Sequence, residues 1–434
     1  MAGRPAKEPA PALRSDIKTD VAIIGGGYTG LATAYHLKTA EPGLDVTVLE
    51  AMTTGFGASG RNGGFVITLF GASLGLMKAF HGKEAVREAH AYMERSIQAL
   101  ELMLKTHSID CDYERSGFLK VATTSAYMRR IRHEINLLQS LGIEGFQLLD
   151  REEIQGRVRS ETYLGACLEP NCALLNPVKW ADALERLALE NGARLYESTR
   201  VTRVRREAGR YRITTDAGSV AADHVVFATN AYTHLLPGLA PKQVPAFAYI
   251  VVTAKLSDAQ RAAIGWAGRE GIEDARNFMH FYRLTPDGRL LMGGGPGFVP
   301  YAGRMDNDAN PFAWDHLRRF IGRTFPALAD IKIDYKWGGA FSVAADSTPH
   351  VGTLDGGGAT YAIGCTGHGV AMSHMNGRII SDLVLNRKTD LTQLWFVNRR
   401  PFPIPPEPLR SIAVRSVMTA MKLDDWWCDR GGPR

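Results

Sequence analysis

The sequence is poor in cysteine, and its cysteines do not form the patterns typical of metal sites or disulfide-rich domains. Five are present in 434 residues: Cys111, Cys167, Cys172, Cys365 and Cys428. No CxxC pair and no Cys/His cluster with zinc spacing occurs. The sequence therefore predicts neither a bound metal nor a disulfide framework, and a cytoplasmic location fits this usage.

Long apolar and long basic stretches are also missing. No apolar run reaches the roughly 18 residues that a membrane-spanning helix requires, and no run of five or more basic residues occurs. The formal net charge is only +6, from 51 Lys and Arg against 45 Asp and Glu. We therefore expect no membrane span and no nucleic-acid partner. Residues 1–16 lack the apolar segment of a signal peptide, and their Pro, Ala and charge content predicts a flexible tail.

The composition that remains is that of a globular protein. Hydrophobic residues make up 45% of the chain and charged residues 22%. A chain of this length and composition can form two domains with substantial cores.

A glycine-rich motif near the N-terminus predicts a dinucleotide site. Residues 21–24 form a short apolar run suited to a buried parallel strand, and Gly25-x-Gly27-x-x-Gly30 follows at once. A helical run extends to about Ala40, and a second strand ends in Glu50. The order strand, glycine turn, helix, strand and acid is the context that confirms the motif. The helix N-terminus would face the pyrophosphate, and Glu50 would bind a ribose hydroxyl, which argues against NADP.

A second glycine-dense stretch follows, from Gly55 to Gly64. With so little side-chain bulk, its backbone N–H groups can approach an extended ligand. Its position after the second strand favours a wall of the cofactor site, although a mobile surface loop explains the composition as well.

The middle of the chain alternates between helical and strand-like patterns. Apolar residues at three- and four-residue spacing predict amphipathic helices over 81–107 and around 128–138. Asn176-Pro177 marks the start of a helix that Asn191-Gly192 ends, and strands follow up to Ala231. From about 244 to 334 the pattern predicts an antiparallel sheet with helical cover.

Near the C-terminus, a strand at Tyr361 leads into a glycine turn, Gly364-Cys-Thr-Gly-His-Gly369, and a helix through Leu385. This second helix N-terminus is another place that can stabilise negative charge. The tail beyond Trp395 is rich in proline and then helical up to about Met421, and we assign it no chemistry.

Together these motifs carry a family resemblance. Residues 21–50, 57–64, 228–232, 337–339 with 349–352, and 364–369 resemble the FAD-dependent amine and amino-acid oxidoreductases related to glycine oxidase and D-amino-acid oxidase. The gamma-glutamylputrescine oxidoreductase branch is the most similar. The likeness covers nearly the whole chain except its two tails.

The resemblance implies a mixed α/β and α+β fold. A Rossmann-like FAD-binding domain would be assembled from residues 17–80, 165–243 and 335–395. An antiparallel-sheet substrate domain would comprise residues 81–164 and 244–334, and residues 396–434 would form a C-terminal extension.

The resemblance also implies which residues contact FAD. The adenosine half and pyrophosphate would be bound near the first motif, and Gly367, His368 and Gly369 would reach the pyrimidine edge of the flavin. The full set is Gly25, Gly27, Tyr28, Thr29, Gly30, Glu50, Ala58, Ser59, Arg61, Asn62, Gly63, Gly64, Val201, Thr229, Gly367, His368 and Gly369. Residues 336–352 lack the cysteine of covalent-flavin relatives, so we expect non-covalent FAD.

The chain departs from its amino-acid-oxidising relatives at one informative position. Phe341 stands where they carry an arginine that clamps a carboxylate, which phenylalanine cannot do. The strand at 290–293 also lacks the lysine that sarcosine-oxidase relatives use near the flavin, so O2 and an unknown carrier both stay open as electron acceptors.

We predict catalytic roles for His368, Tyr282 and Trp337, and substrate contacts for Tyr249, His280, Arg283 and Phe341. Aromatic side chains would cage an amine. Core packing explains Tyr249, Tyr282 and Trp337 equally well, and a surface salt bridge explains Arg283 equally well.

The predicted reaction is oxidation of an amine C–N bond: hydride passes from the α-carbon to flavin N5, and the imine hydrolyses. A primary or secondary amine such as a glutamylated polyamine is the expected substrate, and O2 as acceptor would give H2O2. Two alternatives stay open: a dehydrogenase of amino or hydroxy acids that passes electrons to a carrier, and a flavoprotein in which FAD is structural and the role is partner binding.

Overall fold

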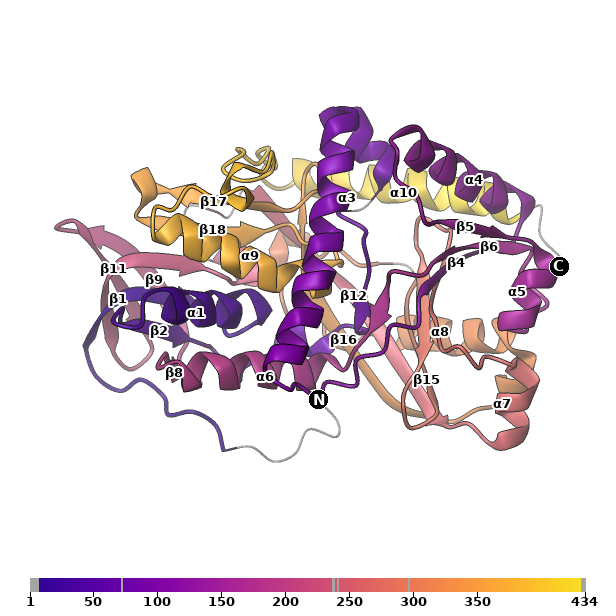
Figure 1. The fold of residues 1–434 in the computed structure, drawn as a ribbon, viewed down its shortest axis with the longest axis horizontal. Coiled ribbons are helices and arrows are strands. Elements are labelled where there is room, and N and C mark those ends of the chain that lie inside the picture. The colour runs from indigo at the N-terminus through magenta and orange to yellow at the C-terminus, as the bar shows by residue number, and fades with distance from the viewer. Residues whose placement is uncertain (1–7, 72, 236–238, 240–241, 296, 431–434) are drawn as a thin grey trace.

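Two large β-sheets lie side by side in the computed structural model, which describes residues 8–71, 73–235, 239, 242–295 and 297–430 (Figure 1). The first sheet has the strand order β17-β18-β11-β1-β2-β8, with β10 paired to β11 and β9 to β10. The second has the order β16-β12-β15-β14-β13-β4-β6-β5. The mixed α/β fold with several sheets confirms the predicted fold class.

The first sheet has a parallel centre, formed by β2, β1, β11 and β18. Its strands are β1 (Ile17–Ile24), β2 (Val46–Leu49), β8 (Arg194–Tyr196), β9 (Val201–Glu207), β10 (Arg210–Thr215), β11 (Ser219–Phe227), β17 (His350–Leu354) and β18 (Ala359–Ile363). Strand β11 lies beside β1 although some 200 residues separate them, because the chain leaves the first sheet and returns. One sheet therefore collects segments from the start, middle and end of the sequence.

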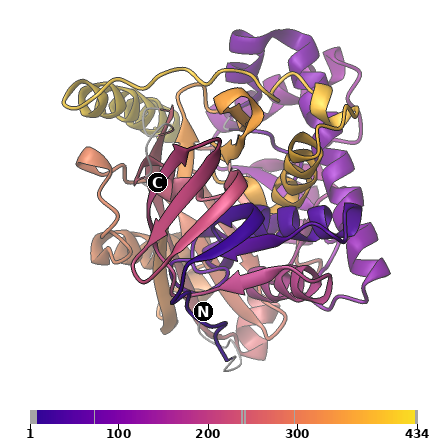
Figure 2. The ribbon, with the colours of Figure 1, turned by 90° about the vertical axis from the view of Figure 1, so that its left-hand side faces the viewer.

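The parallel centre of the first sheet is buried on both faces. Val21 and Ile23 of β1 pack in the same core as the helices, whereas Ala22 and Ile24 pack with β10 and β11 on the other face. This explains the unbroken apolar run of the strand, since alternate residues point to opposite sides and neither side meets water. The covering helices are α1 (Tyr28–Ala40), α3 (Leu74–Thr106), α6 (Pro177–Glu190) and α9 (Gly369–Val384), seen beside the sheet in Figure 2.

The second sheet is antiparallel apart from the β13–β4 pair, among the residues described. Its strands are β4 (Phe118–Ala122), β5 (Gln147–Leu149), β6 (Gly165–Glu169), β12 (Gln243–Lys255), β13 (Gly271–Asp274), β14 (His280–Leu284), β15 (Arg289–Gly294) and β16 (Ile333–Ala344). A short third sheet pairs β3 (Phe65–Val66) with β7 (Ala173–Leu174). The remaining helices are α2 (Ala58–Arg61), α4 (Ser125–Ser140), α5 (Arg151–Arg157), α7 (Asp258–Ile264), α8 (Pro311–Thr324) and α10 (Leu409–Asp429).

Two strands lie in a different sheet from the one that the predicted boundaries imply. Strand β6 pairs with β4 and β5, and β16 pairs with β12, so both belong to the second sheet. The predicted boundaries assign both strands to the FAD-binding domain. The chain therefore changes sheets inside the predicted segments 165–243 and 335–395, because the ladder hydrogen bonds of these strands are made with the second sheet.

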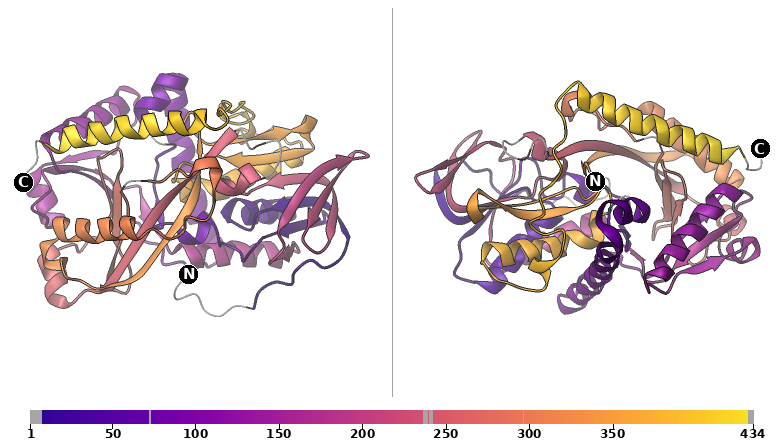
Figure 3. Two further views of the ribbon diagram at one scale, coloured as in Figure 1. Left: turned by 180° about the vertical axis from the view of Figure 1, so that it is seen from behind. Right: turned by 90° about the horizontal axis from the view of Figure 1, so that it is seen from above.

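The described segments near the two termini are attached to the body. Residues 1–7 of the predicted flexible tail lie outside the described residues, but residues 8–16 are held: Leu13 is buried, and its N–H donates to Thr199 Oγ1 at 3.0 Å. At the other end, α10 lies across one side of the molecule, over the second sheet (Figure 3). Within the described residues, no helix is long and apolar enough to cross a membrane, and no group of His, Cys, Asp and Glu could hold a metal ion.

Candidate active site

The glycine turn between β1 and α1 has no room for side chains. Gly25 has φ +109°, and a Cβ there would lie 2.6 Å from the carbonyl oxygen of Ala228. A Cβ on Gly30 would overlap the carbonyl oxygen of Gly25, so the helix packs directly on the turn. Gly27 forms the N-cap of α1 without a capping side chain of its own. The N-terminus of α1 is thus a place where an anion can approach the backbone closely.

Glu50 lies at the end of β2 beside this turn. Its Oε2 accepts the N–H of Gly26 at 2.7 Å, and its Oε1 accepts the N–H of Met52 at 2.9 Å. Burial raises the pKa of the carboxyl, while these backbone donors lower it. Each oxygen retains a lone pair that can accept a hydrogen bond from a hydroxyl group.

The second glycine stretch is packed, which excludes the alternative of a mobile loop. Asn62 ties it together: Nδ2 donates to the carbonyl oxygens of Ala58 and Ser59 at 3.0 and 2.9 Å, and Oδ1 accepts the N–H of Gly64 at 2.8 Å. Ser59 Oγ accepts the N–H of Tyr28 at 2.9 Å, so α2 lies against the start of α1. Because a Cβ on Gly63 would lie 3.0 Å from the Phe281 ring, this stretch also touches the second sheet.

The C-terminal glycine turn places His368 immediately before α9. Gly364 and Gly367 have φ +75° and +85°, and the N–H of His368 donates to the carbonyl oxygen of Cys365 at 2.9 Å. Burial lowers the pKa of His368 to about 4, so the imidazole is neutral at physiological pH. Its Nδ1 is buried and has no hydrogen-bond partner within the described part of the chain.

A cavity of about 620 Å³ extends from Tyr28 and the second glycine stretch to the C-terminal glycine turn. Its lining is mostly apolar. It comes from β12 to β16 of the second sheet, from Tyr28 of α1 and the second glycine stretch, from the C-terminal glycine turn at the start of α9, and from α10. The lining residues used below are Tyr28, Ala58, Ser59, Arg61, Asn62, Gly63, Glu273, Asn277, Phe278, Phe281, Phe341, Cys365, Gly367, His368, Gly369, Arg410, Ala413, Val414, Val417, Met418 and Met421.

Comparison with known proteins gives the family. Residues 20–383 match the model of the DAO family, described as FAD-dependent oxidoreductases. The chain belongs to this family. It is 34% identical over 398 residues to gamma-glutamylputrescine oxidoreductase of Escherichia coli (strain K12), covering 91% of this chain and 90% of that protein. Among solved structures, glycine oxidase from Geobacillus kaustophilus superposes with a TM-score of 0.75 at 23% identity, covering 88% of this chain and 99% of the other. L-proline dehydrogenase from P. horikoshii gives 0.70 at 20% identity, covering 90% and 97%.

These comparisons confirm the resemblance inferred from the motifs. The protein is an FAD-dependent oxidoreductase. The residues present also fit FAD as a DAO-family cofactor. The β1–α1 turn offers a helix N-terminus for the pyrophosphate, Glu50 offers carboxylate oxygens for the ribose, and an apolar cavity wide enough for a ring system begins at Ser59 and Asn62.

The predicted cofactor residues fall into two groups. Tyr28, Ala58, Ser59, Arg61, Asn62, Gly63, Gly367, His368 and Gly369 line the cavity. Gly25, Gly27, Thr29, Gly30, Glu50, Gly64, Val201 and Thr229 do not. Glu50 and the first glycines surround the β1–α1 turn, and Val201 begins β9 two residues after Thr199, whose N–H donates to the Glu50 carbonyl oxygen at 2.8 Å. Thr229 Oγ1 is bonded to Thr233 Oγ1 at 2.8 Å. An extended dinucleotide fits these two groups, with its adenosine half near the β1–α1 turn and its flavin half in the cavity.

The predicted substrate and catalytic residues are mostly elsewhere. Phe341 and His368 line the cavity, whereas Tyr249, His280, Tyr282, Arg283 and Trp337 do not. Tyr282 is hydrogen-bonded to Tyr163 Oη at 2.7 Å, and Tyr249 Oη donates to the Asn307 carbonyl oxygen at 3.0 Å. Both tyrosines are buried, and their hydroxyl groups are bonded within the protein, which fits the packing alternative.

The other three are engaged in their own contacts. His280 is bonded through Nδ1 to Asp274 at 2.8 Å and through Nε2 to His316 at 2.9 Å. Trp337 Nε1 donates to the Arg61 carbonyl oxygen at 2.9 Å. Arg283 is buried behind Gly64 instead of lying at the surface, and burial lowers the pKa of its guanidinium to about 10.

Sequence reasoning missed two contributors to the cavity. Glu273 and Phe281 line it from β13 and β14, and one face of α10 lines it from the C-terminal extension. The α10 residues Arg410, Ala413, Val414, Val417, Met418 and Met421 recur at three- and four-residue spacing. That spacing was visible in the sequence and is the signal that a helix presents one face to a partner.

Proposed function

We propose that this flavoenzyme oxidises an amine at a carbon–nitrogen bond. The observation that supports an amine over an α-amino acid is the charge of the cavity lining. Its two arginines are already paired, Arg61 with Asp308 at 2.7 Å and Arg410 with Glu407 at 2.7 Å. Phe341 lies in the cavity, 3.9 Å from where a Cβ on Gly367 would be. A bidentate clamp for a carboxylate is therefore not available beside the C-terminal glycine turn.

The surroundings favour the neutral form of an amine. When bound, FAD accepts a hydride from the carbon next to the substrate nitrogen. An apolar wall formed by Phe281 and Phe341 disfavours an ammonium ion beside it, because burial disfavours charge. His368, kept neutral by burial, presents its unpartnered Nδ1 as a hydrogen-bonding group that can orient the substrate or the cofactor. Orientation of a deprotonated amine is the main requirement of such a step.

We further propose that the cofactor is held without a covalent bond. Cys365 lines the cavity, but burial raises the pKa of its thiol, and Sγ lies 3.5 Å from Asn230 Oδ1. A thiol kept in its protonated form is a poor nucleophile. Denaturation with acid should therefore release free flavin into the supernatant.

The name of the Escherichia coli relative suggests the substrates to test first: γ-glutamylated polyamines. The purified holoenzyme should lose its yellow colour when γ-glutamylputrescine is added without air, because electrons pass to the bound flavin. Admission of air and measurement of H2O2 then distinguishes O2 from a carrier as the electron acceptor.

Amino acids and hydroxy acids are the comparison substrates, and they test whether the enzyme oxidises acids instead of amines. Bleaching by acids and not by amines would overturn the proposal in favour of a dehydrogenase of acids. Bleaching by neither class would favour a structural FAD.

A further inference from the structure

Glu273 is a buried carboxylate without a hydrogen-bond partner among the described residues. Its side chain is 94% buried, since the residue is 6% exposed, and it lines both the main cavity and a smaller one of about 70 Å³. Among the described residues it forms no hydrogen bond and no ion pair. A buried carboxylate is costly unless something compensates its charge, so the position of Glu273 in a cavity wall indicates a ligand.

The second sheet places Glu273 close to the cofactor side of the main cavity. Glu273 pairs directly with Phe281 of β14, and paired residues share one face of the sheet with their Cβ atoms about 5 Å apart. Phe281 in turn touches Gly63 of the second glycine stretch, where a Cβ would lie 3.0 Å from its ring. Glu273 is thus one strand away from the wall of the flavin site.

Lys120, which lies beside Glu273 on the neighbouring strand β4, already has another partner. Lys120 of β4 pairs with Glu273 on the other side, but its Nζ donates to Glu134 Oε2 of α4 at 2.8 Å. Because Lys120 is bonded to Glu134, it compensates the negative charge of Glu273 only in part.

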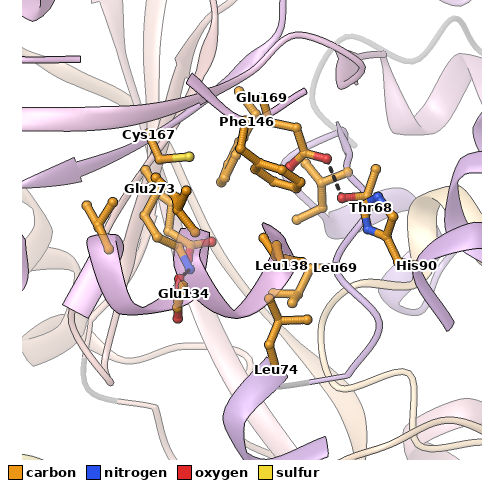
Figure 4. A pocket seen from close by; sticks show the side chains of 15 residues that line it. Thr68, Leu69, Leu74, His90, Glu134, Leu138, Phe146, Cys167, Glu169 and Glu273 are labelled. Atoms are coloured by element: carbon orange, nitrogen blue, oxygen red, sulfur yellow. Dashed lines mark hydrogen bonds and ion pairs between the residues drawn. The ribbon is translucent and has the colours of Figure 1, made fainter. Parts of the chain in front are cut away.

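The small cavity that Glu273 shares is negative in balance (Figure 4). Its charged lining consists of three carboxyl groups, on Glu134, Glu169 and Glu273, and one ammonium group, on Lys120. Burial lowers the pKa of His90 and raises that of Cys167 to about 12, which keeps both neutral. Glu169 accepts a hydrogen bond from Thr68. One cation against three acids leaves room for a second positive charge.

We propose that Glu273 binds a second, positively charged nitrogen of the amine substrate, and that the small cavity receives this end of the molecule. The proposal rests on the proposed amine oxidation. The nitrogen next to the oxidised carbon must be neutral to react, so the cation that a carboxylate recognises is a different nitrogen of the same substrate. The substrate class is therefore an amine that keeps an ammonium group away from the reacting end, such as a polyamine or a glutamylated diamine.

Two substrates that differ by one ammonium group test this assignment. γ-Glutamylputrescine and its glutaryl analogue are identical except that the analogue lacks the α-amino group. We expect the wild-type enzyme to prefer the glutamyl compound in kcat/KM by about 10- to 100-fold, as a charge-assisted hydrogen bond supplies. The preference should come from KM and should disappear in Glu273→Gln, while the glutaryl compound is oxidised equally well by both enzymes.

A buried carboxylate away from the cavity provides the control. Glu270 is 2% exposed and pairs with Arg157 at 3.1 Å, and it does not line either cavity. Glu270→Gln should keep the wild-type preference, whereas an equal preference in wild type and Glu273→Gln would overturn the assignment. FAD content and thermal melting establish that both variants are folded.

Calorimetric binding of the two compounds separates this proposal from the proposed function. If neither compound is oxidised, amine oxidation by this route fails, but tighter binding of the glutamyl compound that Glu273→Gln abolishes would still support the role of Glu273. Oxidation of both compounds with equal binding would overturn Glu273 alone.

Discussion

At the scale of single residues, the ionisation of Glu273 predicts a pH dependence. Burial is the main cause that raises the pKa of its carboxyl to about 7; Lys120 opposes this rise, and Asp274 and Glu134 contribute to it. The carboxylate is therefore present above about pH 7 and is lost as the pH falls through that value. Because the charged form binds the ammonium group, KM for γ-glutamylputrescine should rise about tenfold per unit below pH 7.

The glutaryl analogue removes other titrations from this measurement, since it has the same reacting amine. The ratio of the two KM values should change with pH in the wild type and stay flat in Glu273→Gln. A ratio that is constant from about pH 5 to pH 8 in the wild type would contradict the role of Glu273.

Residues whose surroundings are local were predictable from the sequence. The glycine turn and Glu50 lie within 30 residues of one another, and their spacing alone determines how they meet. The residues of β14 were not predictable in the same way. His280, Phe281 and Tyr282 are all suited to a binding site, and only the strand register decides that Phe281 faces the cavity while Tyr282 contacts Tyr163.

At the scale of elements, α10 acts as a wall of the cavity that is attached at its two ends. Near its start, Glu407 accepts the N–H of Ala302 at 3.0 Å and pairs with Arg410. Near its end, buried Asp425 accepts the N–H groups of Asn277 and Phe278 at 2.8 and 3.0 Å. The sequence indicated a helix up to about Met421 but not its partners, because the contacts join segments about 105 to 148 residues apart.

Asp425 therefore positions both α10 and the cavity residues Asn277 and Phe278. Asp425→Asn replaces one acceptor oxygen with an N–H donor that faces the backbone donors. We expect KM for the amine to rise about tenfold, from the loss of one charge-assisted hydrogen bond, with a smaller change in kcat. Limited proteolysis should cut the segment 401–408 faster than in the wild type.

Asp429 is the matched control on the same helix. It pairs with Arg276 at 2.8 Å, but its side chain is 43% exposed, so Asp429→Asn should change KM and proteolysis little. Equal effects of the two substitutions would show that a general loss of charge on α10, and not the position of residues 277 and 278, is responsible.

At the scale of the whole molecule, the cavity lies between the second sheet and the starts of α1 and α9, the helices that cover the first sheet. Family motifs were sufficient to predict a second sheet that is mostly antiparallel. That β6 and β16 belong to the second sheet was not predictable. The sequence of an apolar strand does not show which neighbouring strand it will form hydrogen bonds with. Since strands of the second sheet line the same cavity as the starts of α1 and α9, which pack on the first sheet, we expect FAD to couple the stability of the two halves.

Removal of FAD should accordingly lower the thermal stability of the entire protein. At a free FAD concentration of about 100 times Kd, binding stabilises the folded state by about 2.7 kcal/mol. Gly27→Ala places a methyl group 2.9 Å from Ser59 Oγ, at the N-terminus of α1, and a tenfold weaker affinity would reduce this gain to about 1.4 kcal/mol at the same FAD concentration. Gly43→Ala is the control, because a Cβ there meets nothing within 4 Å. Calorimetric melting with and without FAD should show a single transition. FAD should raise its midpoint temperature less in Gly27→Ala than in the wild type and Gly43→Ala. Two transitions, of which FAD shifts only one, would mean that the two sheets unfold independently.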